Sequence, residues 1–368
     1  MHTSVRPLER CRRLIVKSRV RSPIRRGREH DVGRCVVGVQ SMLLAGDVGG
    51  TKTLLGIYEP GTPRPIARDI RRFATLDYPG LSAMVAEFIG ARRAPRSIES
   101  AAFGVAGPVR GAVSELTNVP WHVDAMELAE LFSIPRVRLL NDVVAMGHAV
   151  DVLTPDELTV LQAGRPIADG NAALIAPGTG CGVATLHRIG GRFVPIASEA
   201  GHADFAARTP REVRLLDALT TRFGRASYEH VLSGPGLTYI HAVTHDGAQC
   251  RFVADEQGRA NLPAVITATA LAGQCARCAE TVDLFVSVLG AEAGNHGLRS
   301  MATAGVFIGG GIAPRLLPAL RSPTFLKAFR AKAPMERLVI DMPVAIISAD
   351  HPALLGAAVA ATEVAAPE

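Results

Sequence analysis

The stretch MLLAGDVGGTKTLLGI, residues 42–57, joins two apolar segments through a glycine turn that carries a threonine. The stretch AALIAPGTGCGVA, residues 172–184, repeats this design in the second half of the chain. Glycines between strands let backbone N–H groups approach an anion closely, because no Cβ stands in the way. Two such turns, one in each half of the chain, predict a polyphosphate that is held from both sides.

Each turn taken alone also fits an ordinary glycine-rich hairpin. Neither turn has the pattern G-x-x-x-x-G-K-[ST], and neither opens a helix after G-x-G-x-x-G. Asp47 stands beside the first turn, at the end of the apolar segment. Its carboxylate is a hard oxygen ligand that could hold Mg²⁺, directly or through water, next to the phosphates. The two turns together with this carboxylate favour phosphate binding.

The composition is that of a globular protein with room for two domains. The chain has 368 residues, of which 48% are hydrophobic and 20% charged. We expect no membrane segment, because no apolar run reaches the roughly 18–20 residues that a membrane-spanning helix needs. The six cysteines are scattered through a chain too long to require disulfides, which predicts a reducing cytoplasm. We interpret Cys275 and Cys278 as core or helix-face cysteines without further ligands for a metal.

Basic residues are concentrated before Met42. Residues 1–41 contain eleven Lys or Arg and three acidic residues, a net charge of +8, whereas the rest of the chain carries −2. We expect this segment to lie outside the fold, as a disordered extension, a transit-like peptide or translation from a start codon placed too early. A nucleic-acid interpretation would depend on this segment alone, so none is expected for the folded core.

Strand-like and helix-like patterns alternate, which indicates an α/β core. The expected helices span residues 78–93, 125–132, 143–149, 270–289 and 353–364. The expected strands, apart from the two quoted stretches, span residues 100–109, 137–142, 304–308 and 343–348. Asp124 is expected to cap the helix at 125–132.

Polar residues follow several of these segments. Asn141-Asp142 ends a strand, and Asp142 alone would also serve as the cap of the following helix. Glu199 and His202 flank Gly201 after the second glycine turn, where metal binding, a capping role or hydrogen bonding to a polyol are all open. Glu229 precedes a Gly-Pro loop, and by itself fits a carboxylate on a helix surface.

The motifs, taken in order, resemble those of the bacterial glucokinases. The matching stretches are GDVGGT at 46–51, ND at 141–142, GTG at 178–180, EAGHADF at 199–205, EHVLSGPGL at 229–237, GVFIGGGI at 305–312 and PALLG at 352–356. They cover roughly residues 42–360. The resemblance implies the two-domain actin-like ATPase fold, which is ribonuclease H-like and has an interdomain cleft. It implies a small domain of 42–152 with about 345–368, and a large domain of 153–344.

The resemblance also implies an activity, the transfer of the γ-phosphoryl group of ATP to the 6-hydroxyl of D-glucose by a cytoplasmic homodimer. Asp142 would be the catalytic base, and the ring hydroxyls would contact Asn141, Asp142, Glu199, His202 and Glu229. Mg²⁺ would lie near Asp47. ATP would contact Gly46, Asp47, Val48, Gly49, Gly50, Thr51, Gly178, Thr179, Gly180, Gly309, Gly310 and Gly311.

Three alternatives remain open at the level of sequence. The sugar could be another hexose, and the donor could be polyphosphate, since Lys52 replaces an Asn that is frequent in the family. A sugar-responsive repressor would need an N-terminal helix-turn-helix, and residues 1–41 show no pair of apolar-periodic helices. A catalytically inactive sugar sensor is disfavoured, because Asp142 and both glycine turns are intact.

Overall fold

Both quoted stretches form β-hairpins. In the computed structural model, which describes residues 41–91, 97–117, 119–253 and 261–365, β1 (Met42–Val48) pairs antiparallel with β2 (Lys52–Glu59). In the same way β10 (Ala172–Pro177) pairs antiparallel with β11 (Cys181–Ile189). Each glycine turn therefore links two neighbouring strands at one end of a sheet, as the sequence predicts.

The two hairpins belong to two sheets that share a five-strand arrangement. The first sheet has the order β3-β2-β1-β4-β8, and the second has the order β12-β11-β10-β13-β14-β9. In both sheets the first hairpin strand begins a three-stranded antiparallel meander on one side and is followed by two parallel strands on the other. The second sheet has one further strand, β9, which pairs antiparallel with β14 at the edge. The remaining strands of the sheets are β3 (Ile66–Ala74), β4 (Ile98–Val105), β8 (Val137–Asn141), β9 (Leu158–Gln162), β12 (Arg192–Ser198), β13 (Gly305–Ile308) and β14 (Val344–Ile347). This repeated arrangement confirms the predicted α/β, ribonuclease H-like fold.

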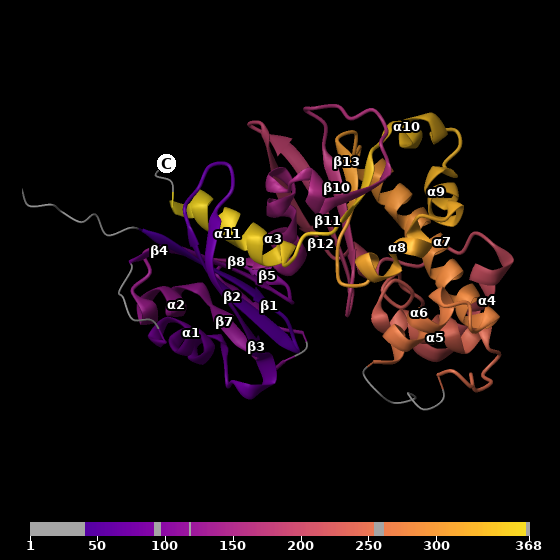
Figure 1. Ribbon diagram of the computed structural model, residues 1–368, viewed down its shortest axis with the longest axis horizontal. Coiled ribbons are helices and arrows are strands. Elements are labelled where there is room, and N and C mark those ends of the chain that lie inside the picture. Colours follow the sequence, from indigo (N-terminus) through magenta and orange to yellow (C-terminus); the bar gives the residue numbers. More distant parts are fainter. Residues whose placement is uncertain (1–40, 92–96, 118, 254–260, 366–368) are drawn as a thin grey trace, which may run out of the picture. The chain divides into compact units, whose positions relative to one another are not determined.

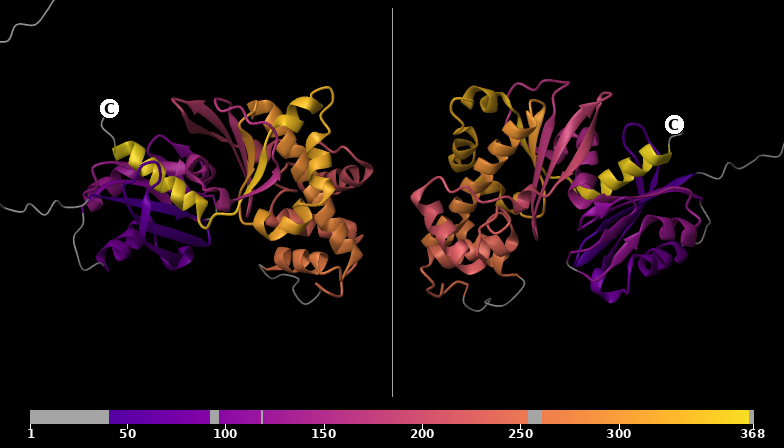
Figure 2. Two further views of the ribbon diagram at one scale, coloured as in Figure 1. Left: turned by 45° about the horizontal axis from the view of Figure 1, so that its top comes forward. Right: turned by 180° about the vertical axis from the view of Figure 1, so that it is seen from behind.

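Helices cover both faces of the first sheet (Figures 1 and 2). Because side chains alternate along a strand, Met42 and Leu44 face one side of β1 and Leu43 faces the other. The first side packs on α1 (Leu81–Gly90) and α2 (Ala125–Phe132). The second side packs on α3 (Asp142–Ala149) and α11 (Pro352–Ala365). Asp124 caps α2 by accepting from the Met126 N–H at 2.7 Å, as the sequence predicts. A small sheet of β5 (Val109–Arg110), β6 (Val113–Glu115) and β7 (His122–Asp124) precedes α2.

The second sheet has a larger helical layer on one face. Ala173 and Ile175 of β10 pack into this layer, whereas Leu174 packs against α3 on the opposite face. The layer is built mainly from α4 (Pro210–Phe223), α5 (Gly234–Thr244), α6 (Leu262–Leu271), α7 (Ala276–Ser300), α8 (Leu317–Leu320), α9 (Pro323–Arg330) and α10 (Glu336–Asp341). Helix α3 therefore contributes to the cores of both sheets.

Close packing of α3 on α11 depends on a glycine. A Cβ on Gly356 would lie 1.7 Å from the carbonyl oxygen of Ala145. Since that neighbour is backbone, a side chain at position 356 would force the two helices apart. The sequence PALLG at the start of α11 thus encodes the contact that fixes α3.

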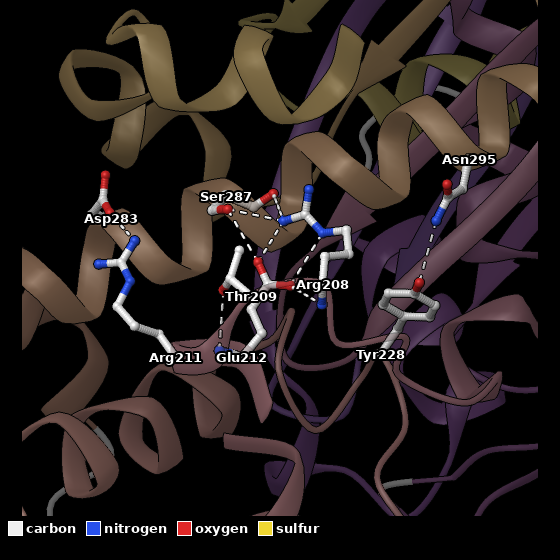
Figure 3. A network of polar contacts seen from close by, with 8 residues as sticks. All are labelled: Arg208, Thr209, Arg211, Glu212, Tyr228, Asp283, Ser287 and Asn295. Atoms are coloured by element: carbon white, nitrogen blue, oxygen red, sulfur yellow. Dashed lines mark hydrogen bonds and ion pairs between the residues drawn. The ribbon is translucent and has the colours of Figure 1, made fainter. Parts of the chain in front are cut away.

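A fully buried carboxylate ties α4 to α7 (Figure 3). Glu212 of α4 accepts hydrogen bonds from the backbone N–H of Arg208 at 2.7 Å and from its guanidinium at 2.5 Å. Ser287 of α7 donates to the same carboxylate at 3.3 Å. Burial of a charge is tolerated when it is paired and hydrogen-bonded in this way.

In the helical layer the structure changes two of the sequence-based expectations. The single helix predicted at 270–289 is wrong: α6 ends at Leu271 and α7 begins at Ala276, because Gly273 adopts φ +67° and interrupts the helix. The interpretation of Cys275 and Cys278 as lacking partners is also wrong, since the Sγ of Cys250 lies 3.8 Å from each of their Sγ atoms. The expectations for residues 1–40 lie outside the described residues.

The division into small and large domains remains a prediction. Among the described residues, no helix is long and apolar enough to cross a membrane.

Candidate active site

Hydrogen bonds from threonines stabilise the first glycine turn. Within the turn, the Gly49 N–H donates to the Lys52 carbonyl at 3.1 Å. Thr75, which follows β3, donates its hydroxyl to the Gly49 carbonyl at 2.8 Å and its N–H to the Thr51 carbonyl at 3.0 Å. The buried hydroxyls of Thr53 and Thr75 lie 2.9 Å apart. These contacts fix the turn while leaving Thr51 exposed.

Asp47 is a carboxylate in an environment that disfavours its charge. Burial, together with the nearby charge of Asp142, raises the pKa of Asp47 from 3.8 to about 6, against a smaller opposing effect of Lys52. A buried carboxylate whose proton affinity is raised by a neighbouring carboxylate offers hard oxygen donors, and a divalent cation would neutralise this charge. The residues present therefore fit a Mg²⁺ ion beside the first glycine turn.

Asp142 lies at the first position of α3, immediately after β8. Burial raises its pKa, and Glu199 adds to the effect, whereas hydrogen bonding from the Val143 N–H to Oδ1 at 2.9 Å opposes it. The reading of Asp142 as the helix cap is wrong. Asn141 is the cap, because its Oδ1 accepts from the N–H groups of Val143 at 3.0 Å and Val144 at 3.4 Å. The carboxylate of Asp142 is thus not required as the helix cap.

The second glycine turn meets two other segments. Within the turn, the Gly178 N–H donates a hydrogen bond to the Gly180 carbonyl at 2.8 Å. Gly234, the first residue of α5, donates its N–H to the Gly178 carbonyl at 2.9 Å. The N-terminus of a helix therefore lies beside the turn. Gly310, with φ +77°, approaches the strand end so closely that a Cβ there would lie 2.3 Å from the Pro177 carbonyl oxygen. Two of the predicted ATP-binding segments are therefore adjacent.

Glu199, His202 and Glu229 form one cluster. The Nε2 of His202 lies 3.9 Å from Oε2 of Glu199, and its Nδ1 lies 3.9 Å from Oε1 of Glu229. The other oxygen of Glu229 accepts from the Cys181 N–H at 2.9 Å, next to the second glycine turn. Glu229 is half-buried in a turn before α5, so its interpretation as a helix-surface carboxylate is wrong.

The backbone explains why this cluster forms. A Cβ on Gly201 would lie 1.9 Å from the Cys181 carbonyl oxygen, so only glycine allows the Glu-x-Gly-His segment to pack on β11. The Glu229 N–H then donates to the Gly201 carbonyl at 2.8 Å, which brings Glu229 to the same place. Tyr228 is buried and accepts at its hydroxyl from Asn295 of α7 at 3.3 Å (Figure 3). The helical layer thus anchors the residue next to Glu229.

A cavity of about 300 Å³ adjoins this cluster. Its polar lining residues are Asn141 and Glu199, and the others include Leu139, Val144 and Pro195. The cavity therefore adjoins the cluster at Glu199, next to Asn141. Its lining does not include Asp142, His202 or Glu229.

The sequence analysis did not predict the roles of two residues that support the site. Thr75 supports the first turn from a position 26 residues away from Gly49, with no local motif to mark it. Ser233 caps α5 by accepting from the Gly236 N–H at 3.0 Å and donates to the Glu229 carbonyl at 2.7 Å. The Ser-Gly-Pro order at 233–235, a cap residue followed by Pro in the first helical turn, is the local signal that could have identified this helix start.

Two glycine turns beside a group of carboxylates and an imidazole, on a duplicated ribonuclease H-like fold, define an ATP-dependent sugar kinase. The sequence profile described as "Glucokinase" matches residues 44–364. The glucokinase of Trichormus variabilis is 35% identical over 338 residues, covering 87% of this chain and 99% of that one. The chain belongs to the glucokinase family.

Solved structures agree with this assignment. The crystal structure of a glucokinase from an Antarctic psychrotroph is 28% identical, with a TM-score of 0.74, and the likeness covers 88% of this chain and 99% of that one. A glucokinase of the ROK family from Streptomyces griseus, solved in complex with glucose and AMPPNP, shares the fold at 19% identity and a TM-score of 0.60, covering 88% of this chain and 99% of that chain.

Proposed function

We propose that the chain transfers the γ-phosphoryl group of ATP to the 6-hydroxyl of D-glucose with Asp142 as the general base, giving glucose 6-phosphate for entry into glycolysis. The observation that carries the proposal is the position of Asp142. It lies at the start of α3 with its charge disfavoured by burial and by Glu199, while Asn141 takes over the capping role. A carboxylate with raised proton affinity that does not serve as the helix cap suits proton abstraction.

In the proposed reaction the 6-hydroxyl oxygen of the sugar attacks the γ-phosphorus as its proton passes to Asp142. The bond from the γ-phosphorus to the bridging oxygen breaks, and ADP leaves with the bonding electrons. Catalysis of this kind depends mainly on positioning and on neutralising charge. Asp142 later releases the proton to solvent.

The sugar hydroxyls would be held by Asn141, Glu199, His202 and Glu229. Carboxylates accept and an imidazole can both donate and accept, so the set can pair with neighbouring hydroxyls in a geometry that depends on their stereochemistry. The 3.9 Å separations of His202 from the two carboxylates leave these groups without short mutual hydrogen bonds. They are therefore available to a ligand.

The triphosphate would lie along the backbone of residues 49–51 and 178–180, with the adenosine beside residues 309–311. The N-terminus of α5 adds a favourable dipole next to the second turn. Mg²⁺ bound near Asp47 would supply charge neutralisation for the phosphates. Asp47 would hold it directly or through water.

The base is tested with Asp142→Asn, and Asp217→Asn on the exposed face of α4 is the matched control. Loss of the base is expected to lower kcat by about 10²-fold or more, with a much smaller change in glucose affinity. The control should retain wild-type kcat. Near-normal kcat in Asp142→Asn would remove Asp142 from the mechanism.

The sugar contacts are tested with Glu199→Gln, His202→Ala and Glu229→Gln. An unpaired sugar hydroxyl costs about 1–3 kcal/mol, so each change should raise the KM for glucose by about tenfold or more. The KM for ATP should change little, because the glycine turns hold the nucleotide. Equal loss of both affinities would indicate damaged folding, and an unchanged glucose KM would remove that residue from the site.

Substrate and donor are tested in one coupled assay, with glucose, mannose and fructose as acceptors and ATP or polyphosphate as donors. The proposal expects the highest kcat/KM for glucose with ATP. Preference for another hexose or for polyphosphate would overturn it.

The proposal includes a cytoplasmic homodimer, which is supported by the family resemblance. Light scattering of the purified chain distinguishes a dimer from a monomer.

A further inference from the structure

A second group of side chains lies in the helical layer, away from the two glycine turns. Helix α5 starts at the second glycine turn and runs for 11 residues, about 16 Å. At its far end stands His245, followed by Cys250 in the next segment. Cys275 immediately precedes α7, and Cys278 lies in the first turn of that helix. Chain segments separated by up to 33 residues thus bring three thiols and an imidazole together.

Four separations within this group lie at or near the edge lengths of a metal tetrahedron. With Zn–S bonds of about 2.3 Å and Zn–N bonds of about 2.05 Å, tetrahedral angles require S···S distances of about 3.8 Å and S···N distances of about 3.6 Å. The Sγ of Cys250 lies 3.8 Å from each of the other two sulfurs. The Nε2 of His245 lies 3.6 Å from the Sγ of Cys275 and 4.0 Å from that of Cys278.

The imidazole of His245 is oriented for ligation. Its Nδ1 lies 2.8 Å from the carbonyl oxygen of His241, which can only accept, so Nδ1 carries the proton. The lone pair is then on Nε2, the atom that faces the sulfurs. A backbone acceptor on the other ring nitrogen is the arrangement that metal-binding histidines usually have.

Burial makes this group unlike a surface cluster. Cys278 is 0% exposed, His245 3% and Cys250 4%, and Cys275 is half-buried. The sulfur separations of 3.8 Å are far above the S–S bond length of about 2.05 Å. His241, stacked on His245 at 3.8 Å, has a buried Nε2 without a hydrogen-bond partner among the described residues. One ligand atom each of His241, His245, Cys250 and Cys278 lies within 4.8 Å of the others, so a cation could lie among these groups.

We propose that Cys250, Cys275, Cys278 and His245 bind a structural Zn²⁺ ion. Three thiolates and one imidazole with a Cys-x-x-Cys pair form a closed four-ligand set, which is typical of structural zinc. As the ion binds, the three thiols release their protons to solvent and four bonds to zinc form, with no change of redox state. The ion would cross-link the end of α5 to the start of α7.

The test measures metal in the full chain, produced without an affinity tag and purified without chelators. Elemental analysis should find about one zinc per chain. Cys278→Ser and His245→Asn should lose most of it. The controls Cys181→Ser and His187→Asn, buried and exposed positions outside the group, should retain it. A Cys11→Ser/Cys35→Ser double variant should also retain it.

A second measurement does not depend on the folding of variants. Wild-type protein, reduced and stripped of metal, is loaded with Co²⁺, and absorption spectra are recorded. Thiolate-to-cobalt charge transfer together with intense tetrahedral d–d bands is the expected result. Wild-type protein that has intact thiols but holds no zinc and gives no such spectrum would overturn the proposal. So would a Cys250 disulfide in the protein as purified, or loss of metal in His241→Asn but not in Cys275→Ser.

Discussion

Asp47→Asn is expected to stabilise the chain in the absence of ligand, and the gain should grow with pH. Burial and the charge of Asp142 raise the pKa of Asp47 to about 6. The unfolded chain has a value near 3.9, so the difference is about two pKa units, or about 3 kcal/mol at 1.36 kcal/mol per unit. Asparagine has nearly the shape of the neutral acid and carries no charge to bury.

The sign follows from proton binding. The folded chain holds the Asp47 proton more tightly than the unfolded chain does, so ionisation opposes folding. The favourable contribution of the neutral acid is complete below about pH 4 and is lost as the pH rises through about 6. The stability gap between variant and wild type should therefore be about 1.5 kcal/mol at pH 5 and about 3 kcal/mol at pH 8.

Urea unfolding at pH 5 and pH 8, without Mg²⁺ or nucleotide, measures this gap. Asp217→Asn, an exposed aspartate, should show no comparable pH-dependent gain. Mg²⁺ with nucleotide should stabilise the wild type more than the variant, because a ligand that binds only the folded state adds to its stability. A gap that is absent at pH 8, or one that shrinks between pH 5 and pH 8, would refute the reasoning.

Three other changes probe separate contacts. In Gly180→Ala the new Cβ would lie 2.5 Å from Oε2 of Glu229, so the carboxylate must move and the glucose KM should rise about tenfold. Initial-rate kinetics measure this, and an unchanged KM would show that the carboxylate relocates without effect. Gly356→Ala should lower the free energy of unfolding by about 1–3 kcal/mol or more, because the clash is with the Ala145 carbonyl. Thermal unfolding at wild-type Tm would contradict it. A chain beginning at Met42 should retain kcat and Tm, and loss of either would give the basic segment a structural role.

Much of the fold could be predicted because its signals are local. The glycine hairpins at 42–57 and 172–184 lie within single stretches, and strand pairing followed from them. The polar positions after β8 and after the second hairpin were also found, since strand ends are recognisable from composition. What local signals could not decide was which of two adjacent residues caps α3, because Asn and Asp are equally good caps.

The remaining features depend on contacts between distant segments. The local pattern around Glu229 fits a helix surface, and only the family resemblance put this residue among the sugar contacts. In the structure its carboxylate accepts from the Cys181 N–H, 48 residues earlier in the sequence. The partners of Cys275 were missed for the same reason, since His245 is 30 residues away in the sequence. Only the tertiary fold defines such neighbours.

The two oxygens of Glu229 face different parts of the proposed site. One oxygen accepts from the Cys181 N–H at the phosphate turn, and the other faces His202 in the sugar cluster. If a sugar hydroxyl donates a hydrogen bond to Glu229, as proposed, it should shift the hydrogen bond to the Cys181 N–H. We therefore expect the two substrates to have a coupling free energy through this side chain. Reciprocity then requires that glucose changes the affinity for nucleotide by the same factor as nucleotide changes the affinity for glucose. Calorimetric titration of a non-hydrolysable ATP analogue with and without glucose measures that factor. In Glu229→Gln it should approach one, so that each substrate binds as though the other were absent.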